Sequence, residues 1–156
     1  MAEKTVQELM TKNVITVYRD TTVGELSRIL IKNSITGVPV VDRDGKLTGM
    51  VTDADIITEN LDPIFPIYFD PLIMSYAYLD NFEKYRRDVK DYLSTRVEDI
   101  MTRRVKTVRN DTPVSDAVRI MVKDRINRIP VVDENNKVTG ILARADVLKS
   151  MLSDTE

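Results

Sequence analysis

A short stretch near residue 50 places one hydroxyl and two carboxylates at the start of an expected helix. Thr52 follows an apolar run expected to be a strand, and Asp53 and Asp55 come directly after it. Threonine is a good N-cap, and acidic residues in the first turn complement the helix dipole. The same turn offers backbone N–H groups that suit a phosphate and a carboxylate that suits ribose hydroxyls. Ordinary helix capping is the alternative explanation.

The same pattern recurs at a fixed offset of 91 residues (140 − 49 = 91). Residues 49–55 are Gly-Met-Val-Thr-Asp-Ala-Asp, and residues 140–146 are Gly-Ile-Leu-Ala-Arg-Ala-Asp. The offset aligns the surrounding sequence without a gap, and the aligned pairs include Met10 and Met101, Thr16 and Thr107, Pro39 and Pro130, and Asp55 and Asp146. Repetition of this kind indicates two copies of one structural unit. Because each copy is small, we expect the two to share a core.

Each copy is expected to contain a strand, a helix, two strands and a second helix, which makes the fold class α/β (α+β). In the first copy these elements are a short leading helix or turn at 5–10, a strand at 14–17, a helix to about Asn33, strands at 37–41 and 46–51, and a helix at 52–60. Pro113 favours a first helical position, which predicts Thr112 and, by register, Thr21 as N-caps. The Asp44-Gly45 pair is typical of a tight hairpin turn.

Residues 61–96 separate the copies and differ from them in composition. All three phenylalanines and five of the six tyrosines of the chain lie here. Prolines at 63, 66 and 71 predict an irregular loop over 61–70, followed by a helix that begins at Asp70-Pro71 and ends near Leu93. Its apolar residues recur at steps of four and three, as in a coiled-coil seam; they are Tyr78, Phe82, Tyr85, Val89 and Tyr92. We expect this helix to pack against its own module, with a dimer contact or a lid over a ligand cleft as alternatives. The predicted domains are 1–60, 61–96 and 97–156.

Composition narrows the classes of function. With 23 basic and 25 acidic side chains, the charge gives no footprint for nucleic acid or for an anionic membrane. The chain has no histidine and no cysteine, which removes the commonest general base, the commonest metal ligand and thiolate chemistry. We therefore expect no catalytic residue and no metal site. The absence of a signal-peptide pattern or a membrane-length apolar run predicts a cytoplasmic protein.

Together these motifs resemble the CBS-domain family, in particular a tandem pair of CBS repeats (a Bateman module). The motifs are Val-Pro-Val-Val-Asp at 38–42, Ile-Pro-Val-Val-Asp at 129–133, Met-Thr at 10–11 and 101–102, and Gly-x-x-Thr-x-x-Asp at 49–55. The resemblance implies two repeats packed about a pseudo-two-fold axis, with two clefts between them. It also implies adenosine ligands in those clefts, AMP above all, no cofactor, and assembly of two modules into a homodimer.

In the first cleft the resemblance implies a sugar site at Asp55, with Thr52 beside it. An adenine slot would be formed by Val14, Ile15, Thr16, Ile35, Thr36, Gly37, Val38 and Pro39. Core packing is the alternative role of the apolar residues in this set.

The second cleft departs from the family pattern because Ala143 replaces the usual serine or threonine. The residues implied there are Lys106, Thr107, Ile126, Asn127, Arg128, Ile129, Pro130, Arg144 and Asp146. Both arginines could bind a phosphate through their planar guanidinium groups. The positions aligned with Lys106, Arg128 and Arg144 are Ile15, Gly37 and Asp53, none of which is basic. We therefore expect unequal sites, with the charged nucleotide in the second and either a less charged adenosine compound or no ligand in the first. An exposed arginine without a ligand is the alternative for Arg144.

Two functions follow from the sequence. The first is a regulatory module that binds AMP, with ADP or ATP possible, and passes a conformational change to a separate effector protein. The second is a dimerisation scaffold whose clefts are vestigial, and a sensor of S-adenosylmethionine or methylthioadenosine is a further alternative. An enzyme, a membrane partner and nucleic-acid binding are all disfavoured.

Overall fold

The computed structural model describes residues 2–58 and 77–155, with the side chains of 77–82 left out of the description. The predicted loop at 61–70, the Asp70-Pro71 cap and the side chains of Tyr78 and Phe82 lie outside the described residues. No helix in the described part of the protein is long and apolar enough to cross a membrane.

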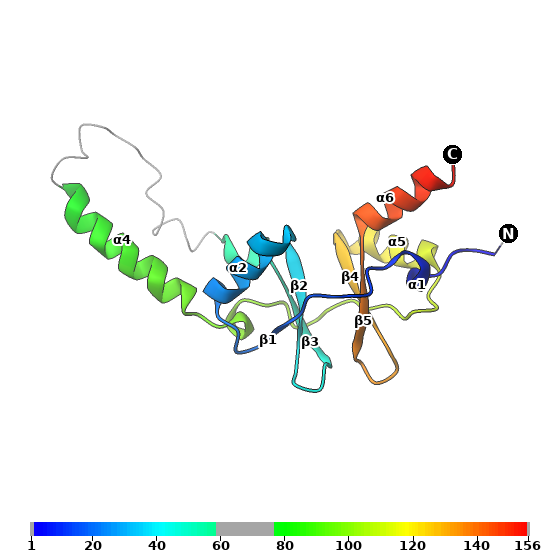
Figure 1. Ribbon diagram of the computed structural model, residues 1–156, viewed down its shortest axis with the longest axis horizontal. Helices are drawn as coiled ribbons and strands as arrows, with labels where there is room; N and C mark the ends of the chain where they lie inside the picture. Colours follow the sequence, from blue (N-terminus) through cyan, green and yellow to red (C-terminus); the bar gives the residue numbers. More distant parts are fainter. Residues whose placement is uncertain (1, 59–76, 156) are drawn as a thin grey trace. The chain divides into compact units, whose positions relative to one another are not determined.

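Figure 1 shows the described elements, in which each copy contributes helices and a pair of adjacent strands. The first copy contains α1 (Val6–Leu9), β1 (Val17–Tyr18), α2 (Val23–Asn33), β2 (Gly37–Val41), β3 (Leu47–Thr52) and α3 (Asp53–Ile56). Helix α4 (Ala77–Leu93) follows, and the second copy contains the 3₁₀ turn η2 (Val97–Asp99), α5 (Val114–Asp124), β4 (Arg128–Val132), β5 (Val138–Ala143) and α6 (Arg144–Ser153). The mixed α/β fold with two repeats is confirmed.

Each copy forms a small sheet, and the second sheet has one strand fewer than the first. In the first, the strands lie in the order β1-β2-β3, and Val17 of β1 pairs in parallel with Val40 of β2. In the second, β4 and β5 are antiparallel, and Val108 makes a single parallel bridge to Val131. Both hairpin turns contain a residue with positive φ, Gly45 at 82° and Asn136 at 63°. The predicted Asp-Gly turn is therefore confirmed, and asparagine, which tolerates this conformation, replaces glycine in the second copy.

The protein forms two compact units, and neither unit coincides with one sequence copy. The larger unit comprises Met1–Tyr18, Val38–Met50 and Thr102–Glu156, and the smaller comprises Arg19–Gly37 and Val51–Met101. The division at 1–60, 61–96 and 97–156 stays a prediction about the sequence repeat.

The segment that leads into each copy pairs with the other copy. In the larger unit the N–H of Val6 donates to the carbonyl of Thr112 at 2.8 Å, and Thr11 bridges to Ile141. In the smaller unit the equivalent N–H of Val97 donates to the carbonyl of Thr21, also at 2.8 Å. These two contacts are equivalent under the 91-residue offset. The two copies therefore exchange their leading segments, each of which pairs with the other copy.

The core of the larger unit contains residues from both copies. Its buried residues are Val6, Val108, Ala117, Met121, Ile129, Val131 and Leu142, and Leu9 and Met10 pack against them. Val6 belongs to the first copy and is fully buried among residues of the second. Burial of a valine side chain contributes about 1.5–3 kcal/mol, so the leading segment stabilises the second copy substantially. This is the shared core that the small size of each copy predicts.

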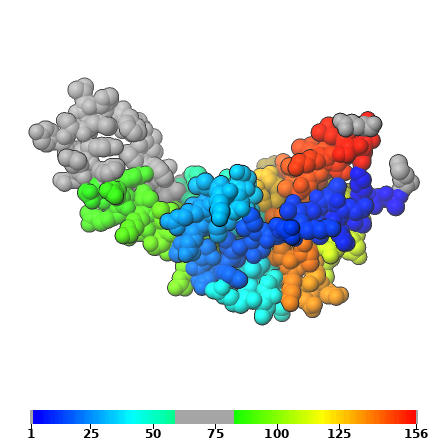
Figure 2. All heavy atoms as spheres, in the orientation of Figure 1, coloured from blue at the N-terminus to red at the C-terminus, as the bar shows by residue number. Residues whose placement is uncertain are grey.

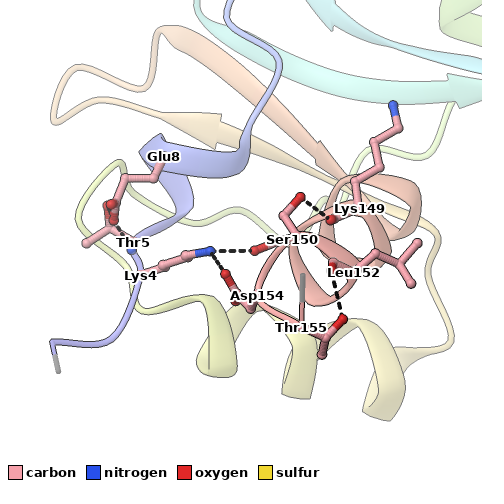
Figure 3. A network of polar contacts seen from close by, with 9 residues as sticks. Lys4, Thr5, Glu8, Lys149, Ser150, Leu152, Asp154 and Thr155 are labelled. Carbon is pink, nitrogen blue, oxygen red and sulfur yellow. Dashed lines mark hydrogen bonds and ion pairs between the residues drawn. The ribbon is translucent and has the colours of Figure 1, made fainter.

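A polar network holds the N-terminal segment against α6. The Lys4 ammonium donates to Ser150 Oγ at 3.0 Å and pairs with Asp154 Oδ1 at 2.5 Å, as Figure 3 shows. Helix α1 packs against α6 and β5 in the same unit. The space-filling view in Figure 2 shows the N-terminal residues in direct contact with this part of the second copy.

The structure corrects three predicted boundaries. The predicted strand over 14–17 forms a ladder only at Val17 and Tyr18. By register the residue before Val17 would face Pro39, which has no N–H to donate to the ladder.

The predicted caps at Thr21 and Thr112 are wrong by one residue. Helix α2 is capped by Thr22, whose hydroxyl accepts from the N–H of Glu25 while the Glu25 carboxylate accepts from the N–H of Thr22. In the second copy Pro113 occupies the N-cap position with ψ of 139°, and the hydroxyl of Thr112 accepts from the N–H of Arg109 instead.

The predicted helix over 52–60 is also too long, because α3 ends at Ile56. Three consecutive β-branched residues, Ile56, Ile57 and Thr58, disfavour its continuation. Helix α6, at the equivalent position, runs for 10 residues.

Candidate functional site

The strand-to-helix junction of the first copy holds a carboxylate in place through backbone hydrogen bonds. At the end of β3, the N–H of Thr52 donates to Asp55 Oδ2 at 2.8 Å. The next N–H, that of Asp53, donates to the carbonyl of Thr36 at 2.8 Å. These two bonds bring the loop before β2 beside the start of α3. Asp55 is half-buried there, whereas Asp53 is exposed.

The second copy repeats both backbone hydrogen bonds of this junction, but it lacks the bond that the Thr52 hydroxyl donates to Asp55 Oδ2 at 3.4 Å. The N–H of Ala143 donates to Asp146 Oδ2 at 2.9 Å, and the N–H of Arg144 donates to the carbonyl of Asn127 at 3.0 Å. Asp146 is half-buried, as its counterpart Asp55 is. The loss of the hydroxyl at Ala143 therefore leaves the backbone arrangement intact, and the cap expected to be lost is retained in part by the carboxylate.

The second oxygen of each carboxylate, Oδ1, could accept hydrogen bonds from a ligand. In both junctions Oδ2 is bound to a backbone N–H, and no hydrogen bond to Oδ1 of Asp55 or Asp146 is formed by the residues that the structure describes. A carboxylate oxygen has two lone pairs, so Oδ1 can accept from a pair of neighbouring hydroxyls. The arrangement thus combines a fixed carboxylate with an adjacent loop of exposed or half-buried residues.

A left-handed residue at the end of the preceding helix sets the path of each loop. Ser34 has φ of 52° and Arg125 has φ of 54°, which turns the backbone sharply before the loop. The N–H groups of Ile35 and Ile126 then donate to carbonyls of α2 and α5, at 3.0 Å each. Sequence reasoning missed these two residues, since neither serine nor arginine is typical of a left-handed C-cap.

The residues predicted for the first site are divided between the two units. Thr36, Thr52 and Asp55 are joined by the bonds described above, and Ile35 and Gly37 flank Thr36 in the same smaller unit. The other five belong to the larger unit: Val14 is half-buried, Ile15 and Thr16 are exposed, and Val38 and Pro39 are buried. Burial of Val38 and Pro39 agrees with the core-packing alternative for these two residues.

All nine residues predicted for the second site lie in the larger unit. Ile129 and Pro130 are buried, Thr107, Ile126, Arg128 and Asp146 are half-buried, and Lys106, Asn127 and Arg144 are exposed. Arg128 pairs with Ala143, the last residue of β5, in the ladder between β4 and β5, which places it beside the junction. Arg144 Nε donates to the carbonyl of Ile126 at 3.2 Å, so its guanidinium folds back over the same loop. Arg128 and Arg144 are therefore carried by elements that form the junction of Asp146, whereas Lys106 lies outside these elements.

One residue near the first junction was not assigned to the site by sequence reasoning. The Tyr92 hydroxyl, from α4, donates to the carbonyl of Ile56 at 2.6 Å. Burial raises the pKa of the Tyr92 phenol above its usual value, and the carboxylate of Asp55 raises it further. The only sequence signal was its position at the end of the aromatic seam of the insert.

Comparison with known proteins gives one family match and several related structures. The model of the CBS domain family matches residues 6–62 and again 97–153. The protein MJ1426 of Methanocaldococcus jannaschii is 33% identical over 153 residues, which cover 94% of this chain and 90% of that protein.

Two solved structures similar to this chain contain adenosine compounds. The CBS domain pair of protein MJ0100, in complex with 5′-methylthioadenosine and S-adenosyl-L-methionine, is 26% identical with a TM-score of 0.71, covering 98% of this chain and 99% of that one. CBSX2 from Arabidopsis thaliana, in complex with AMP, is 28% identical with a TM-score of 0.71, covering 97% and 98%.

Proposed function

The chain belongs to the CBS domain family, and we propose that it is a regulatory module that senses an adenosine-containing ligand. AMP is the leading candidate, and ADP, ATP, S-adenosylmethionine and methylthioadenosine are the compounds to compare with it. The structures of MJ0100 and CBSX2 support this choice, since both hold adenosine compounds and are matched over nearly their whole length.

The duplicated junction is the observation that carries the proposal. In each copy a half-buried aspartate is fixed by one backbone bond through Oδ2 while Oδ1 stays available. Hydrogen bonds from ribose hydroxyls to such a carboxylate would be charge-assisted and would gain strength from partial desolvation. The adjoining loops, at Thr36 and Asn127, would supply backbone groups for the base.

The two sites would prefer ligands of different charge. Arg144 and Arg128 carry positive charge beside the second junction, whereas Asp53 occupies the position of Arg144 in the first. A phosphate would be attracted to the second site and repelled from the first. We therefore propose that AMP binds more tightly at the Asp146 site than at the Asp55 site, and that an adenosine compound without phosphate is preferred at the Asp55 site.

A thermal-shift screen with AMP, ADP, ATP, S-adenosylmethionine and methylthioadenosine tests the proposal. A ligand present at about 100 times its Kd stabilises the folded state by roughly 2.7 kcal/mol, which raises the Tm of a protein of this size by several degrees. At least one of the five compounds should produce such a rise. The absence of a shift with all five at millimolar concentration contradicts the proposal.

The output of the module would pass through association, either with a second copy or with an effector protein. Two pairs of equivalent residues are apolar and exposed: Ile31 (81%) with Val122 (69%), and Ile57 (74%) with Leu148 (60%). Their occurrence at the same positions in both copies favours a symmetric partner such as a homodimer. We propose no catalytic activity, because the sequence supplies no histidine or cysteine for it.

A scaffold without a ligand is the second candidate function. It is favoured by the fact that both aspartates, at the third position of their helices, already accept from the N–H of the N-cap residue, which is a sufficient structural role. The same thermal-shift screen separates the two functions. A homodimer that shows no response to any of the five compounds would support the scaffold.

A further inference from the structure

Helix α3, which carries Asp55, is too short to hold its own geometry. It contains four residues, Asp53–Ile56, and forms one turn. One turn of helix is unfavourable in isolation, since several dihedral angles are fixed for a single hydrogen bond. The position of Asp55 therefore depends on what holds the two ends of this turn.

The N-terminal end of α3 is held by the loop before β2, through the bond from Asp53 to the carbonyl of Thr36. The C-terminal end is held from outside the repeat. The Tyr92 hydroxyl donates to the carbonyl of Ile56, the last residue of the turn, at 2.6 Å. A carbonyl in the last turn of a helix has no partner within the helix, so the phenol of Tyr92 acts as a C-cap for α3.

The second copy does not need such a cap, because α6 continues beyond Asp146 to Ser153. The insert helix thus supplies to the first junction what the longer α6 supplies to the second. Its attachment is firm at this end, since the carbonyl and Cβ of Leu93 lie against Gly24 of α2, where an added Cβ would come within 3.2 Å.

We infer that Tyr92 is a positioning residue for Asp55, and that through it the insert helix α4 controls the affinity of the first ligand site. This inference rests on the proposed function. It makes the two sites differ in regulation as well as in charge, since only the first is tied to α4. By linkage, a ligand bound at Asp55 must stabilise the attachment of α4 as much as that attachment favours the ligand.

The test measures AMP binding by titration calorimetry in the Asp146→Asn background, where only the first site remains, and in the Asp55→Asn background, where only the second remains. Tyr92→Phe, which removes one hydroxyl, should weaken binding about five- to tenfold in the Asp146→Asn background, as expected for one hydrogen bond. It should leave the second site unchanged. Ser94→Ala removes a hydroxyl that donates to the carbonyl of Lys90 at the end of α4 and not to α3. It serves as the control, with first-site affinity equal to that of the parent.

Hydrogen exchange supplies a second measurement that does not require a ligand. Tyr92→Phe should speed exchange of the Ile57 amide, which donates to the carbonyl of Asp53 across the turn. AMP should slow exchange over 83–93 in the Asp146→Asn protein and should not do so when Tyr92→Phe is added.

The outcomes separate the two proposals. An Asp146→Asn protein that gives no AMP isotherm contradicts binding of AMP at Asp55, and exchange at Ile57 then decides whether Tyr92 holds the turn. An isotherm that Tyr92→Phe leaves within twofold of the parent overturns the positioning role alone. Weakening of both sites to the same extent also overturns it, because that result would indicate a general loss of structure.

Discussion

The two junctions share a backbone arrangement and an aspartate, and they differ in the two residues at the start of the helix. Each fixes an aspartate by the same pair of hydrogen bonds, at distances that agree within 0.2 Å between the copies. Around this frame, Thr52 and Asp53 in the first copy are replaced by Ala143 and Arg144 in the second. The comparison teaches that the frame depends on main-chain groups, so the side chains around it are free to diverge and to select different ligands.

The copies also differ in what holds the helix beyond the junction. Helix α6 is long and is bound at its far end by Lys4, through Ser150 and Asp154. Helix α3 is a single turn and is bound by Tyr92. In both cases the segment that precedes one repeat contacts the second helix of a repeat, but an exposed ion pair is worth little and a phenol-to-carbonyl bond in a partly buried setting is worth more.

The largest effect is expected from the residue that the copies exchange. Val6→Ala should lower the free energy of unfolding by about 2 kcal/mol, because it removes two methyl groups from a filled core. Chemical denaturation measures this loss, and hydrogen exchange should locate it in β4, within the second copy. Val122→Ala, at a position that is 69% exposed, should cost less than about 0.5 kcal/mol. Destabilisation confined to the first copy would contradict the packing of its leading segment against the second copy.

A smaller effect is expected from the charge difference between the junctions. Arg144→Ala should weaken ATP binding about five- to tenfold, since one partly solvated ion pair is lost, and should leave methylthioadenosine binding unchanged. Asp53→Arg copies the second junction into the first and should strengthen ATP binding there. Competition calorimetry with the two ligands measures both changes. Equal weakening of ATP and methylthioadenosine would show that Arg144 does not contact a phosphate.

The helix caps offer a comparison of stability alone. Thr22→Ala removes one half of a reciprocal cap and should cost about 1 kcal/mol in free energy of unfolding. Thr112→Ala removes a hydroxyl that accepts from Arg109 in the loop before α5, so α5 itself keeps its start and the cost should be smaller. Urea denaturation of the two variants measures the difference. If Thr112→Ala lowered the free energy of unfolding more than Thr22→Ala does, Thr112 would be the N-cap of α5, as the sequence predicts.

The smallest effect concerns pH and the leading segment. A backbone hydrogen bond from Thr5 holds the pKa of the Glu8 carboxyl below its usual value of 4.5. Because the folded pKa is the lower one, this group stabilises the fold above the unfolded value, and the contribution is lost as pH falls through the folded value. Glu8→Gln should therefore reduce the decline in Tm between pH 6 and pH 3. A decline identical to that of the parent would show that Glu8 does not contribute.

The sequence predicted the repeat, the order of elements and the location of both aspartates, because these depend on local pattern and on a fixed offset. It did not predict that Val6 completes the core of the other copy, since an apolar residue in a short leading segment does not reveal its partner. The Thr22-x-x-Glu25 pattern was present, but the proline at 113 favoured the preceding residue as the cap.

The part played by Tyr92 was missed for a related reason. Its position in the seam of the insert indicated an apolar contact, while its hydrogen bond to Ile56 depends on where α3 ends. That end is set by a run of β-branched residues whose effect on helix length is weak and easily overridden. Contacts of this kind lie between elements and have no period in the sequence.

The central claim is that Asp55 and Asp146 each hold the sugar of an adenosine ligand, and titration calorimetry with AMP tests it most directly. Asparagine keeps the size of aspartate and an oxygen that can accept the capping N–H, but it removes the charge. The account predicts that Asp55→Asn and Asp146→Asn each remove one binding event and that the double variant, still folded, binds no AMP. A folded double variant that binds AMP as the wild-type protein does would contradict it.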